Sequence, residues 1–255
     1  MAADLVATLF IEDNMTENKK IPCHVAVIMD GNGRWAERKG VSKLAGHNAG
    51  MLAMKEIIKR ADVMGIKYLT VYAFSTENWR RSQEEVGGIF HLLVKYVGSE
   101  LEELNRNHVK VRILGDYSKI PKTAVNSIEK ALKTTKHNEG LQFNIALNYG
   151  GRQEILRAVQ NICRQVETGK LQAEDITEHL IEKYLYTGEE NGSLPDPDLI
   201  IRTSGEERLS NFLLWQCAYS EFAFSDSLWP DFTPDEFQAI VEEFSGRNRR
   251  FGGRI

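Results

Sequence analysis

Short apolar segments alternate with longer amphipathic segments along most of the chain. The short segments are rich in β-branched and aromatic residues and run into Gly, Asp, Asn, Ser or Arg. This composition and length are typical of buried β-strands. We predict strands at residues 24–29, 68–74, 109–114, 141–147, 199–202 and 221–224.

The longer segments carry apolar residues at helical spacing. The clearest case is residues 86–104, where apolar positions recur every three or four residues at Val86, Ile89, Phe90, Leu93, Val94, Val97 and Leu101. We predict helices at residues 47–64, 84–106, 121–136, 151–168, 173–185, 207–218 and 234–245, and the start of another after a Gly-rich turn at residues 31–33.

Strands that are separated by helices favour right-handed crossovers and a parallel sheet with helices on both faces. We therefore predict an α/β fold, a single domain with a mostly parallel central sheet of about six strands flanked by helices. Residues 1–20 are predicted to form a lead-in segment and residues 21–255 the domain itself. Residues 187–198 are rich in Gly, Pro and acidic side chains, which predicts a loop rather than a domain boundary.

Composition narrows the class of protein. The 255 residues are 42% hydrophobic, ample for one core, and the net charge of −4 argues against a nucleic-acid partner. The three cysteines form no CxxC pair, which favours a reducing compartment over a disulfide framework or a metal site. The apolar patch at residues 5–11 is too short to span a bilayer and has no basic residue before it, so we expect a cytoplasmic protein without a secretory signal.

In open α/β sheets ligands bind beyond the carboxyl ends of the strands, so the residues that follow each strand are the candidates for function. The first predicted strand runs into Asp30, then a Gly-rich turn, then Arg34. Glycines let backbone N–H groups approach phosphate oxygens, and a helix N-terminus favours anions. A carboxylate beside such a cradle would repel a diphosphate unless a cation lay between them, so Asp30 indicates Mg²⁺, which typically binds one or two carboxylates plus substrate phosphates.

Two other interpretations of this loop stay open from the residues alone. Asp30-Gly31 is a common turn after a strand. Residues 31–36 also match the loose G-x-G-x-x-A pattern of dinucleotide binders, although the acidic residue expected about 20 positions later is absent.

Cationic and polar side chains follow this loop and the second strand. Arg34, Lys43 and His47 come soon after the loop, and each can neutralise a diphosphate. Residues 75–81 then bring hydroxyl, carboxylate, amide, indole and guanidinium groups together after the second strand. Helix capping is the alternative explanation for residues 75–78.

A second cationic cluster follows the fifth predicted strand. Arg202 ends that strand, and Arg208 and Ser210 come after a Gly-containing turn, a set suited to bidentate binding of another phosphate group. Pairing with Glu206 and with the adjacent acid at position 207 is the alternative. Further on, Glu221 stands in an aromatic run, where an acid caps a helix, is paired locally or binds a metal.

Six segments together resemble the cis-prenyltransferases, with the bacterial undecaprenyl diphosphate synthase type as the nearest match. They are His24-Val-Ala-Val-Ile-Met-Asp-Gly-Asn-Gly-Arg-Trp-Ala, Tyr72-Ala-Phe-Ser-Thr-Glu-Asn-Trp, Asn148-Tyr-Gly-Gly-Arg, Asp198-Leu-Ile-Ile-Arg-Thr-Ser-Gly-Glu, Leu209-Ser-Asn-Phe-Leu-Leu-Trp-Gln and Leu228-Trp-Pro-Asp-Phe. The resemblance extends from Ile21 to Gly253, and motifs of this length are far more specific than a lone G-x-G.

The resemblance implies a Mg²⁺-dependent prenyltransferase. It would add isopentenyl diphosphate in successive cis condensations to an allylic diphosphate, with farnesyl diphosphate as the expected primer, giving a long-chain polyprenyl diphosphate such as undecaprenyl diphosphate. Asp30 would hold Mg²⁺ and be essential for catalysis, Asn78 would assist proton removal, and Glu221 would complete the metal site from the direction of a second subunit. The substrate-binding residues implied are Gly31, Asn32, Gly33, Arg34, Trp35, Lys43, His47, Ser75, Thr76, Glu77, Trp79, Arg81, Arg202, Arg208, Leu209 and Ser210.

The resemblance also divides these residues between the two substrates. Residues 31–35, with His47 and Arg81, would bind the allylic diphosphate, and residues 75–79 would form a mobile segment over the site. The residues of the second cationic cluster would bind isopentenyl diphosphate. The family often has Arg where this chain has Lys43, and lysine keeps the charge but loses the bidentate fork.

An apolar product needs an apolar tunnel, which we expect between the sheet and the helices predicted at 47–64 and 84–106. Both helices carry small residues among large apolar ones, although ordinary core packing explains any single residue as well. Arg250-Phe251-Gly252 resembles the tail with which family members complete a partner's active site, so we expect a homodimer. Peripheral membrane contact for product release is a further expectation.

Two competing functions are weighed against this one. A non-catalytic accessory subunit of a prenyltransferase complex would have lost Asp30 and residues 31–34, which are intact here. A dinucleotide-dependent oxidoreductase would be revealed by a nicotinamide-binding titration.

Overall fold

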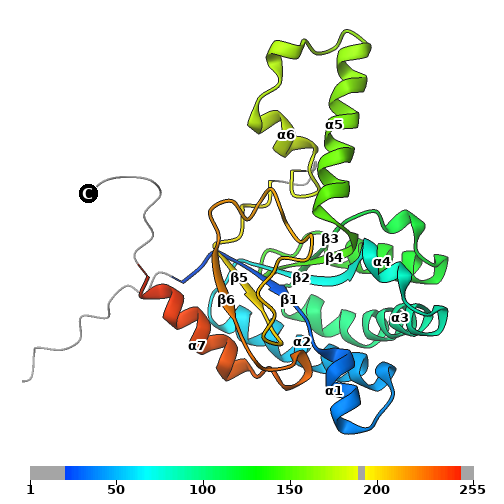
Figure 1. Cartoon of the computed structure of the whole chain (residues 1–255), viewed down its shortest axis with the longest axis vertical. Helices are drawn as coiled ribbons and strands as arrows, with labels where there is room; N and C mark the ends of the chain where they lie inside the picture. The colour runs from blue at the N-terminus through cyan, green and yellow to red at the C-terminus, as the bar shows by residue number, and fades with distance from the viewer. Residues whose placement is uncertain (1–20, 189–192, 248–255) are drawn as a thin grey trace, which may run out of the picture.

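The computed structural model describes residues 21–188 and 193–247 and contains one six-stranded sheet. The strand order is β3-β4-β2-β1-β5-β6, and every neighbouring pair is parallel (Figure 1). The strands are β1 (His24–Ile28), β2 (Tyr68–Ser75), β3 (Lys110–Leu114), β4 (Gln142–Tyr149), β5 (Leu199–Arg202) and β6 (Glu221–Phe224). This confirms the predicted α/β fold with a parallel sheet of about six strands.

Seven α-helices connect and flank these strands within the described part of the chain. They are α1 (Asn32–Lys39), α2 (Lys43–Val63), α3 (Gln83–Arg106), α4 (Lys122–Thr135), α5 (Gly151–Glu167), α6 (Glu178–Tyr184) and α7 (Pro234–Ser245). Figure 1 shows α2, α3, α4 and α7 against one face of the sheet, while α5 and α6 extend away from it. None of these helices is long and apolar enough to cross a membrane.

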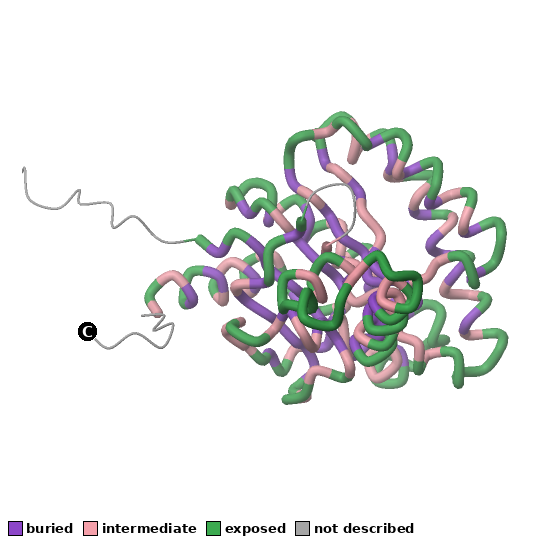
Figure 2. Tube along the Cα trace, turned by 90° about the horizontal axis from the view of Figure 1, so that it is seen from above, coloured by how far each residue is buried: buried purple, intermediate pink, exposed green. Residues whose placement is uncertain are grey.

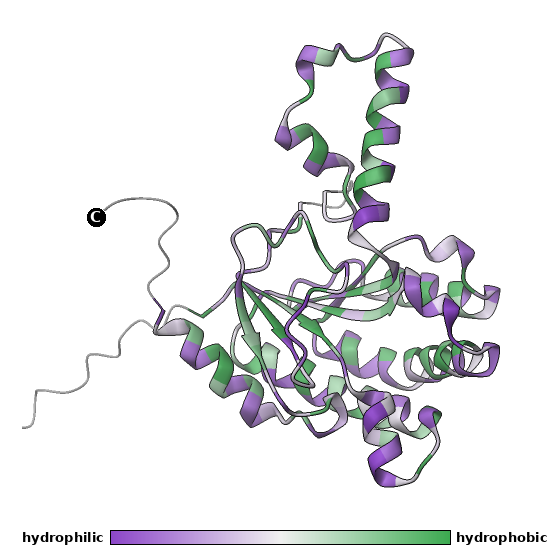
Figure 3. Ribbon diagram, in the orientation of Figure 1, coloured by the Kyte–Doolittle hydropathy of each residue, from purple (hydrophilic) through white to green (hydrophobic). Residues whose placement is uncertain are grey.

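The sheet separates two hydrophobic cores, because alternate residues of a strand point to opposite faces. Val25 and Val27 of β1 belong to the large core beneath α2, α3, α4 and α7, and Ala26 and Ile28 belong to a smaller core on the other face. The central strands β1, β4 and β5 are accordingly buried, whereas the edge strand β6 is only partly covered and the outer turns of the helices are exposed (Figure 2). Figure 3 shows the same division in hydropathy, with hydrophobic strands and helices that alternate between hydrophilic and hydrophobic residues.

Two helix predictions differ from the structure. The segment predicted as a helix at 207–218 is a series of turns in which Ser210, Asn211 and Leu213 have positive φ angles of 48°, 67° and 44°. Its apolar side chains pack on the smaller core, with Phe212 fully buried, and its backbone oxygen at Asn211 accepts from Gly151 N at 2.7 Å. These tertiary contacts replace the helical hydrogen bonds that the apolar pattern predicted.

The segment predicted as one helix at 173–185 is divided. A 3₁₀ helix at Ala173–Asp175 precedes α6, and the hydroxyl of Thr177 caps α6 by accepting from Leu180 N at 3.2 Å. The short helix expected after the Gly-rich turn is confirmed as α1. The predicted lead-in segment at residues 1–20 and the tail Arg250-Phe251-Gly252 lie outside the described residues.

His24, the first residue of β1, is buried without a charge. Its Nδ1 lies 2.6 Å from the carbonyl oxygen of Pro195, and its Nε2 lies 2.7 Å from Thr70 Oγ1. A carbonyl oxygen only accepts, so Nδ1 carries the proton and Nε2 accepts from the threonine hydroxyl. Burial lowers the pKa of His24 to about 4, which outweighs the opposite effects of Pro195 and Asp198.

Stability should therefore fall as pH drops from 6.5 towards 4. In this window His24 takes up a proton in the unfolded chain, at its ordinary pKa, but stays neutral in the folded one. The difference between the two pKa values corresponds to a loss of about 3 kcal/mol at pH 4. Urea unfolding of the wild type and of His24→Gln at pH 7 and pH 4 would measure it. The variant should lose about that much less than the wild type, and equal losses in both proteins would contradict the prediction.

Candidate active site

The strand order places β1 at a switch point, with β2 on one side and β5 on the other. Asp30 follows β1 and Arg202 ends β5, so the parallel register brings them together at the carboxyl edge of the sheet. Arg202 Nη2 donates to Asp30 Oδ2 at 2.8 Å, and Arg34 Nη2 lies 3.2 Å from Asp30 Oδ1. One carboxylate thus meets two guanidinium groups at the place where α/β sheets bind ligands.

The charge of Asp30 is fixed by these partners. Burial by itself raises the pKa of Asp30, but the hydrogen bond and charge of Arg202, with the charge of Arg34, outweigh it and hold the pKa below its usual value. The carboxylate is therefore ionised at neutral pH. The side chain of Asp30 is 29% exposed whereas that of Arg202 is only 4% exposed, so the free face of the pair is the carboxylate.

The second cationic cluster forms around the other side of Arg202. Its Nη1 donates to Ser210 Oγ at 2.8 Å and to the carbonyl oxygen of Arg208, while its buried Nε has no hydrogen-bond partner. Arg208 is exposed and pairs with Glu206, which also accepts from Arg34 at 3.1 Å. The structure therefore brings Arg34, Arg202, Arg208 and Ser210 together, with Leu209 packed against the smaller core.

The Gly-rich turn starts α1 with its amide groups available. Gly31 adopts a φ of 113°, which favours glycine, and no side chain caps the helix. The first N–H groups of a helix have no intrahelical partner. The buried amide oxygen of Asn32 also has no partner, and an amide flip would present a donor at the same position. Trp35 is turned away from this turn and donates from its indole to Asp231 at 2.8 Å.

Ser75 ends β2, and the residues after it form a short 3₁₀ helix, η1 (Thr76–Arg80). Asn78 Oδ1 accepts from Ser75 N at 3.1 Å and so holds the turn. The Trp79 indole donates to Asn148 Oδ1 at 2.8 Å. The Glu77 carboxylate accepts from the Asn211 amide at 2.9 Å and from the Thr76 hydroxyl at 3.2 Å. Asn148 and Asn211, which the sequence interpretation did not select, thus anchor the segment that was expected to move.

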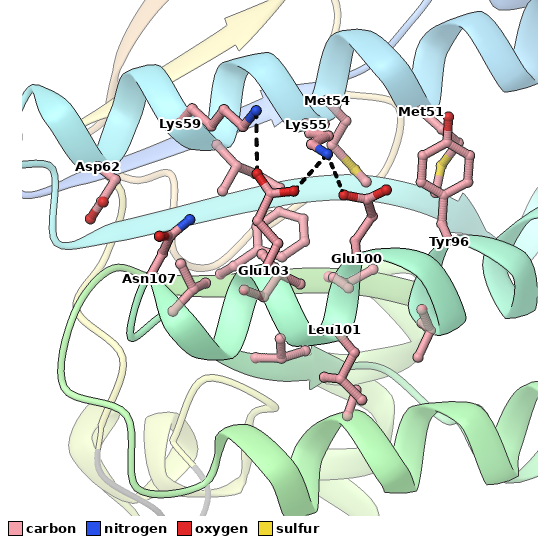
Figure 4. A pocket seen from close by; sticks show the side chains of 18 of the residues that line it. Met51, Met54, Lys55, Lys59, Asp62, Tyr96, Glu100, Leu101, Glu103 and Asn107 are labelled. Atoms are coloured by element: carbon pink, nitrogen blue, oxygen red, sulfur yellow. Dashed lines mark hydrogen bonds and ion pairs between the residues drawn. The ribbon is translucent and has the colours of Figure 1, made fainter.

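Two cavities lie between the sheet and helices α2 and α3. The smaller, of about 70 Å³, begins at Asn32 and His47. The larger, of about 370 Å³, lies further along α2 and α3 and is walled by β3 and β4 (Figure 4). Both are lined by the same four residues where they adjoin, namely Met51, Met54, Leu93 and Ile145.

Known proteins of similar sequence and structure bear on this arrangement. Residues 28–252 match the family model described as "Putative undecaprenyl diphosphate synthase". The isoprenyl transferase of Streptococcus thermophilus is 51% identical over 233 residues, which cover 91% of this chain and 94% of the relative. The isoprenyl transferase of Clostridium perfringens is 48% identical over 234 residues, covering 92% of this chain and 91% of the relative. The chain belongs to the undecaprenyl diphosphate synthase family.

Solved structures agree with this assignment. Lavandulyl diphosphate synthase from Lavandula x intermedia, in complex with dimethylallyl diphosphate, is 37% identical with a TM-score of 0.88 and covers 91% of this chain and 99% of its own. A "probable undecaprenyl diphosphate synthase" from Campylobacter jejuni is 35% identical with a TM-score of 0.73 and the same coverage. This member of the undecaprenyl diphosphate synthase family is therefore an enzyme, a cis-prenyltransferase.

Glu85 is a residue of the site that the sequence interpretation did not predict. Its carboxylate contacts Arg81 at 3.0 Å and both Lys43 and His47 at 3.3 Å, so it gathers three of the predicted diphosphate ligands. Burial raises the pKa of Glu85, but the His47 hydrogen bond and the charges of Arg81 and Lys43 outweigh it and lower the pKa. The signals for this residue were its place four positions after Arg81 and the capping motif that begins at Ser82.

His47 itself is neutral at pH 7. Burial lowers its pKa below the usual value, more than the hydrogen bond to Glu85 raises it. A carboxylate only accepts, so the one N–H of the neutral ring is at Nε2 and is donated to Glu85. The ring adds no charge, so Lys43 and Arg81 supply the positive charge of this group.

Glu221 is not brought to Asp30 within the chain. It begins β6, at the amino end of a strand that is parallel to β1, whereas Asp30 lies beyond the carboxyl end of β1. Glu221 instead pairs with Arg247 at 3.1 Å. Within residues 21–188 and 193–247 no three His, Cys, Asp or Glu side chains gather as a metal cluster. A metal site that uses both carboxylates would need a second copy of the chain.

Gly33 is a helical glycine whose Cβ position is open, since nothing lies within 4 Å of it. Packing does not require glycine there, so Gly33→Ala should leave stability unchanged or raise it by up to about 1 kcal/mol. If the predicted diphosphate site is at this helix start, the added methyl group would obstruct it, so KM for the allylic substrate should rise about tenfold, or about 1.4 kcal/mol. Thermal melting and steady-state kinetics would measure both effects.

A matched control is available in α3. Gly98 is also helical with an open Cβ position, so Gly98→Ala should give a similar stability change without the rise in KM. An unchanged KM in Gly33→Ala would remove this residue from the predicted binding site.

Proposed function

We propose that the enzyme adds isopentenyl diphosphate in successive cis condensations to an allylic diphosphate, with farnesyl diphosphate as primer and Mg²⁺ as cofactor. The product would be a long-chain polyprenyl diphosphate such as undecaprenyl diphosphate. The observation that carries the proposal is the junction of a charged site and an apolar cavity. Asn32 and His47 lie at the cationic site and also line the smaller cavity. A diphosphate head and a prenyl tail can therefore be bound side by side.

The cationic residues divide into two groups that suit two diphosphates. Lys43, His47 and Arg81 gather around Glu85 beside the cavity mouth and would bind the allylic diphosphate, with the first amides of α1. Arg202, which contacts Asp30, and Arg208, whose carbonyl oxygen accepts from Arg202, would bind isopentenyl diphosphate. The negative charge that develops on the departing diphosphate would be stabilised by preorganised donors of the first group.

The proton lost in each condensation needs an acceptor. Asn78 is no base, and its Oδ1 is engaged with Ser75 N. Its amide nitrogen can donate to a diphosphate oxygen, so Asn78 would orient that oxygen to take the proton from the isopentenyl carbon. The anchoring of residues 75–79 by Asn148 and Asn211 would keep water from the reacting carbons.

Asp30 fits Mg²⁺ that is bound together with substrate. It is ionised and partly exposed, and Mg²⁺ commonly takes one or two carboxylates with the remaining positions filled by phosphate and water. The ion would compete with Arg34 and Arg202 for the carboxylate oxygens. When bound, it would neutralise charge on the diphosphate.

The two cavities would together form the tunnel for the growing chain. Leu93 lines both, so Leu93→Trp should obstruct their junction. The first condensations should proceed, but the product should stop several isoprene units short of the wild-type product. Overpacking should also cost roughly 1 to 3 kcal/mol of stability. Chromatography of the products would test this, with Ile176→Trp as control, because Ile176 is exposed and lines neither cavity. If Leu93→Trp makes products of wild-type length, the prenyl chain does not pass through the junction of the two cavities.

A homodimer is the proposed assembly. Its support is a set of exposed apolar side chains, with Phe224 on the edge strand β6 and Leu156 and Val159 on α5. The proposed metal role of Glu221 depends on this assembly, because its own chain keeps it away from Asp30. Sedimentation at micromolar concentration would test the dimer, and a monomeric active enzyme would exclude it.

Peripheral contact with a lipid surface is proposed for product release. Leu52 and Val63 are exposed on α2, the helix that lines both cavities. Eleven positions apart, they lie on nearly the same side of the helix. We expect the double variant Leu52→Ser, Val63→Ser to lose flotation with lipid vesicles and to keep the wild-type rate of the first condensation. Undiminished flotation would exclude this surface.

The deciding experiment is incorporation of labelled isopentenyl diphosphate into lipid-extractable product with farnesyl diphosphate, with and without Mg²⁺. Product that requires Mg²⁺ is the expected result. Folded dimeric protein that makes no product from any allylic primer would favour the accessory-subunit interpretation.

A further inference from the structure

The larger cavity has a mostly apolar lining, and its polar and charged residues, which include Asp62 and Asn107, lie on α2 and at the end of α3. The sheet side is formed by side chains such as Val111, Phe143 and Ile145. On the side where α2 and α3 face each other, the lining includes Lys55, Lys59, Glu100 and Glu103. A prenyl chain offers these four charged groups no partner, so their presence needs another explanation.

These four residues bind one another across the gap between the helices. Lys55 Nζ lies 2.5 Å from Glu100 Oε2 and 2.8 Å from Glu103 Oε2, and Lys59 Nζ lies 3.3 Å from Glu103 Oε1. Figure 4 shows the lysines reaching from α2 to the glutamates of α3 in front of the cavity. We call this set of four residues the clasp. The hydrogen bonds that Lys55 donates to Glu100 and Glu103 raise the pKa of Lys55, and those that Glu103 accepts from Lys55 and Lys59 lower the pKa of Glu103.

The clasp and the sheet wall of the larger cavity are held together by different interactions. The sheet wall is backbone-paired and buried, whereas the four clasp side chains are between 23% and 45% exposed. Ion pairs at this exposure are weak and are screened by salt. The lysine stems can lie along the apolar lining while their ammonium groups face solvent. This wall can therefore open without unfolding the sheet.

The clasp also lies at a defined distance along the path of the chain. Lys55 is eight residues after His47 on α2, which corresponds to roughly 12 Å along the helix axis. The extended tail of a farnesyl primer already spans about this distance, so the clasp lies beside the chain from the first additions onward. A product that has filled both cavities can lengthen only by passing the clasp. Further growth must then pass between α2 and α3.

We propose that the clasp sets the length of the product, by closing the gap between α2 and α3 through which a longer prenyl chain would have to grow. The inference rests on the proposed function, since it requires successive condensation. Lys55 is the residue to test, because of the two clasp lysines it is the one that contacts both Glu100 and Glu103.

The test uses Lys55→Glu, which places a third carboxylate beside Glu100 and Glu103 and opens the clasp by repulsion. The expected product is longer than that of the wild type by at least one isoprene unit, and the rate of the first condensation stays within about twofold. The double variant Lys55→Glu, Glu100→Lys restores the attraction and should return the product to wild-type length. Lys119→Glu, which reverses a surface ion pair with Asp116 outside the cavity lining, serves as control and should not change the product.

Salt supplies a second readout that a purely structural role would not change. Raising the salt concentration from about 0.05 to about 0.5 M should lengthen the wild-type product by weakening the clasp, and should not change that of Lys55→Glu. If Lys55→Glu does not fold, Lys55→Met is measured instead and should give the same direction.

Product lengths that are unchanged or shorter in the open variants, with a normal first condensation, would overturn the proposal. Measuring the first condensation with a single equivalent of isopentenyl diphosphate distinguishes failure of the clasp proposal from failure of the proposed function. Absence of that step in the wild type would refute the function itself, whereas its presence with insensitive product lengths would refute only the clasp.

Discussion

Replacing Asp30 with Asn should lower kcat about a thousandfold, which corresponds to about 4 kcal/mol of transition-state stabilisation. Asparagine keeps the size of the side chain and an oxygen that can accept from Arg202. It removes the negative charge, which is the property that would hold Mg²⁺ on the diphosphate. Because the arginines that would bind the substrates remain, KM for both should change by less than about tenfold.

The control for this variant is Asp235→Asn. Asp235 also pairs with an arginine, Arg60, at 2.9 Å, but it is exposed on α7 and does not line a cavity. It should retain wild-type kinetics. Thermal melting must accompany both variants, because Asp30→Asn leaves the buried Arg202 without a carboxylate partner. Retention of more than a tenth of kcat by folded Asp30→Asn would show that this carboxylate is not essential.

The strands could be predicted from the sequence because each is a short apolar run that ends in a turn. The bounds of β5 and β6 agree with the prediction at both ends. The apolar run at 207–218 misled the helix prediction for a physical reason. Phe212 and Leu213 are buried in a core that is formed with distant strands, and no local pattern specifies left-handed backbone at Ser210 and Asn211.

The candidate site was predicted as far as it follows from the ends of strands. Asp30 and Arg202 each follow a parallel strand, so their meeting could be expected once the sheet was inferred. Glu85 could not be placed in the same way. Its contact with Lys43 joins residues 42 positions apart on two helices, and its meaning depends on how those helices pack.

The clasp was missed for the same reason, because Lys55 and Glu103 are 48 positions apart. In the sequence of each helix, these two residues are indistinguishable from ordinary surface charges. Only the packing of α2 against α3 makes them a wall of the cavity. For Glu221 the residue alone left capping, local pairing and metal binding open, and the family resemblance implied a metal role from a second subunit. The parallel register places Glu221 at the far end of the sheet from Asp30 of its own chain, so that role stays a prediction about the assembly.

Replacing Arg202 with Met should lower kcat/KM for isopentenyl diphosphate by about a hundredfold to a thousandfold, or about 3 to 4 kcal/mol. The guanidinium group joins both sides of the site, with Nη2 on Asp30 and Nη1 on Ser210 Oγ. Methionine fills the same space without a donor, so both partners lose the group that aligns them. Arg202→Lys keeps the charge but cannot reach both sides at once, so it should show an intermediate loss.

The kinetic pattern distinguishes substrate binding from a structural role. If Arg202 binds isopentenyl diphosphate, KM for that substrate should rise far more than KM for the allylic diphosphate. Arg60→Met is the matched control, since Arg60 also contacts a carboxylate and a polar side chain, Asp235 and Gln238, but outside the site. It should leave both KM values unchanged. An equal rise of both KM values in Arg202→Met, together with a lower melting temperature, would assign Arg202 to holding β5 and Asp30 in place. The binding of the second diphosphate would then rest on Arg208, whose exposed guanidinium group is held beside the site by Glu206.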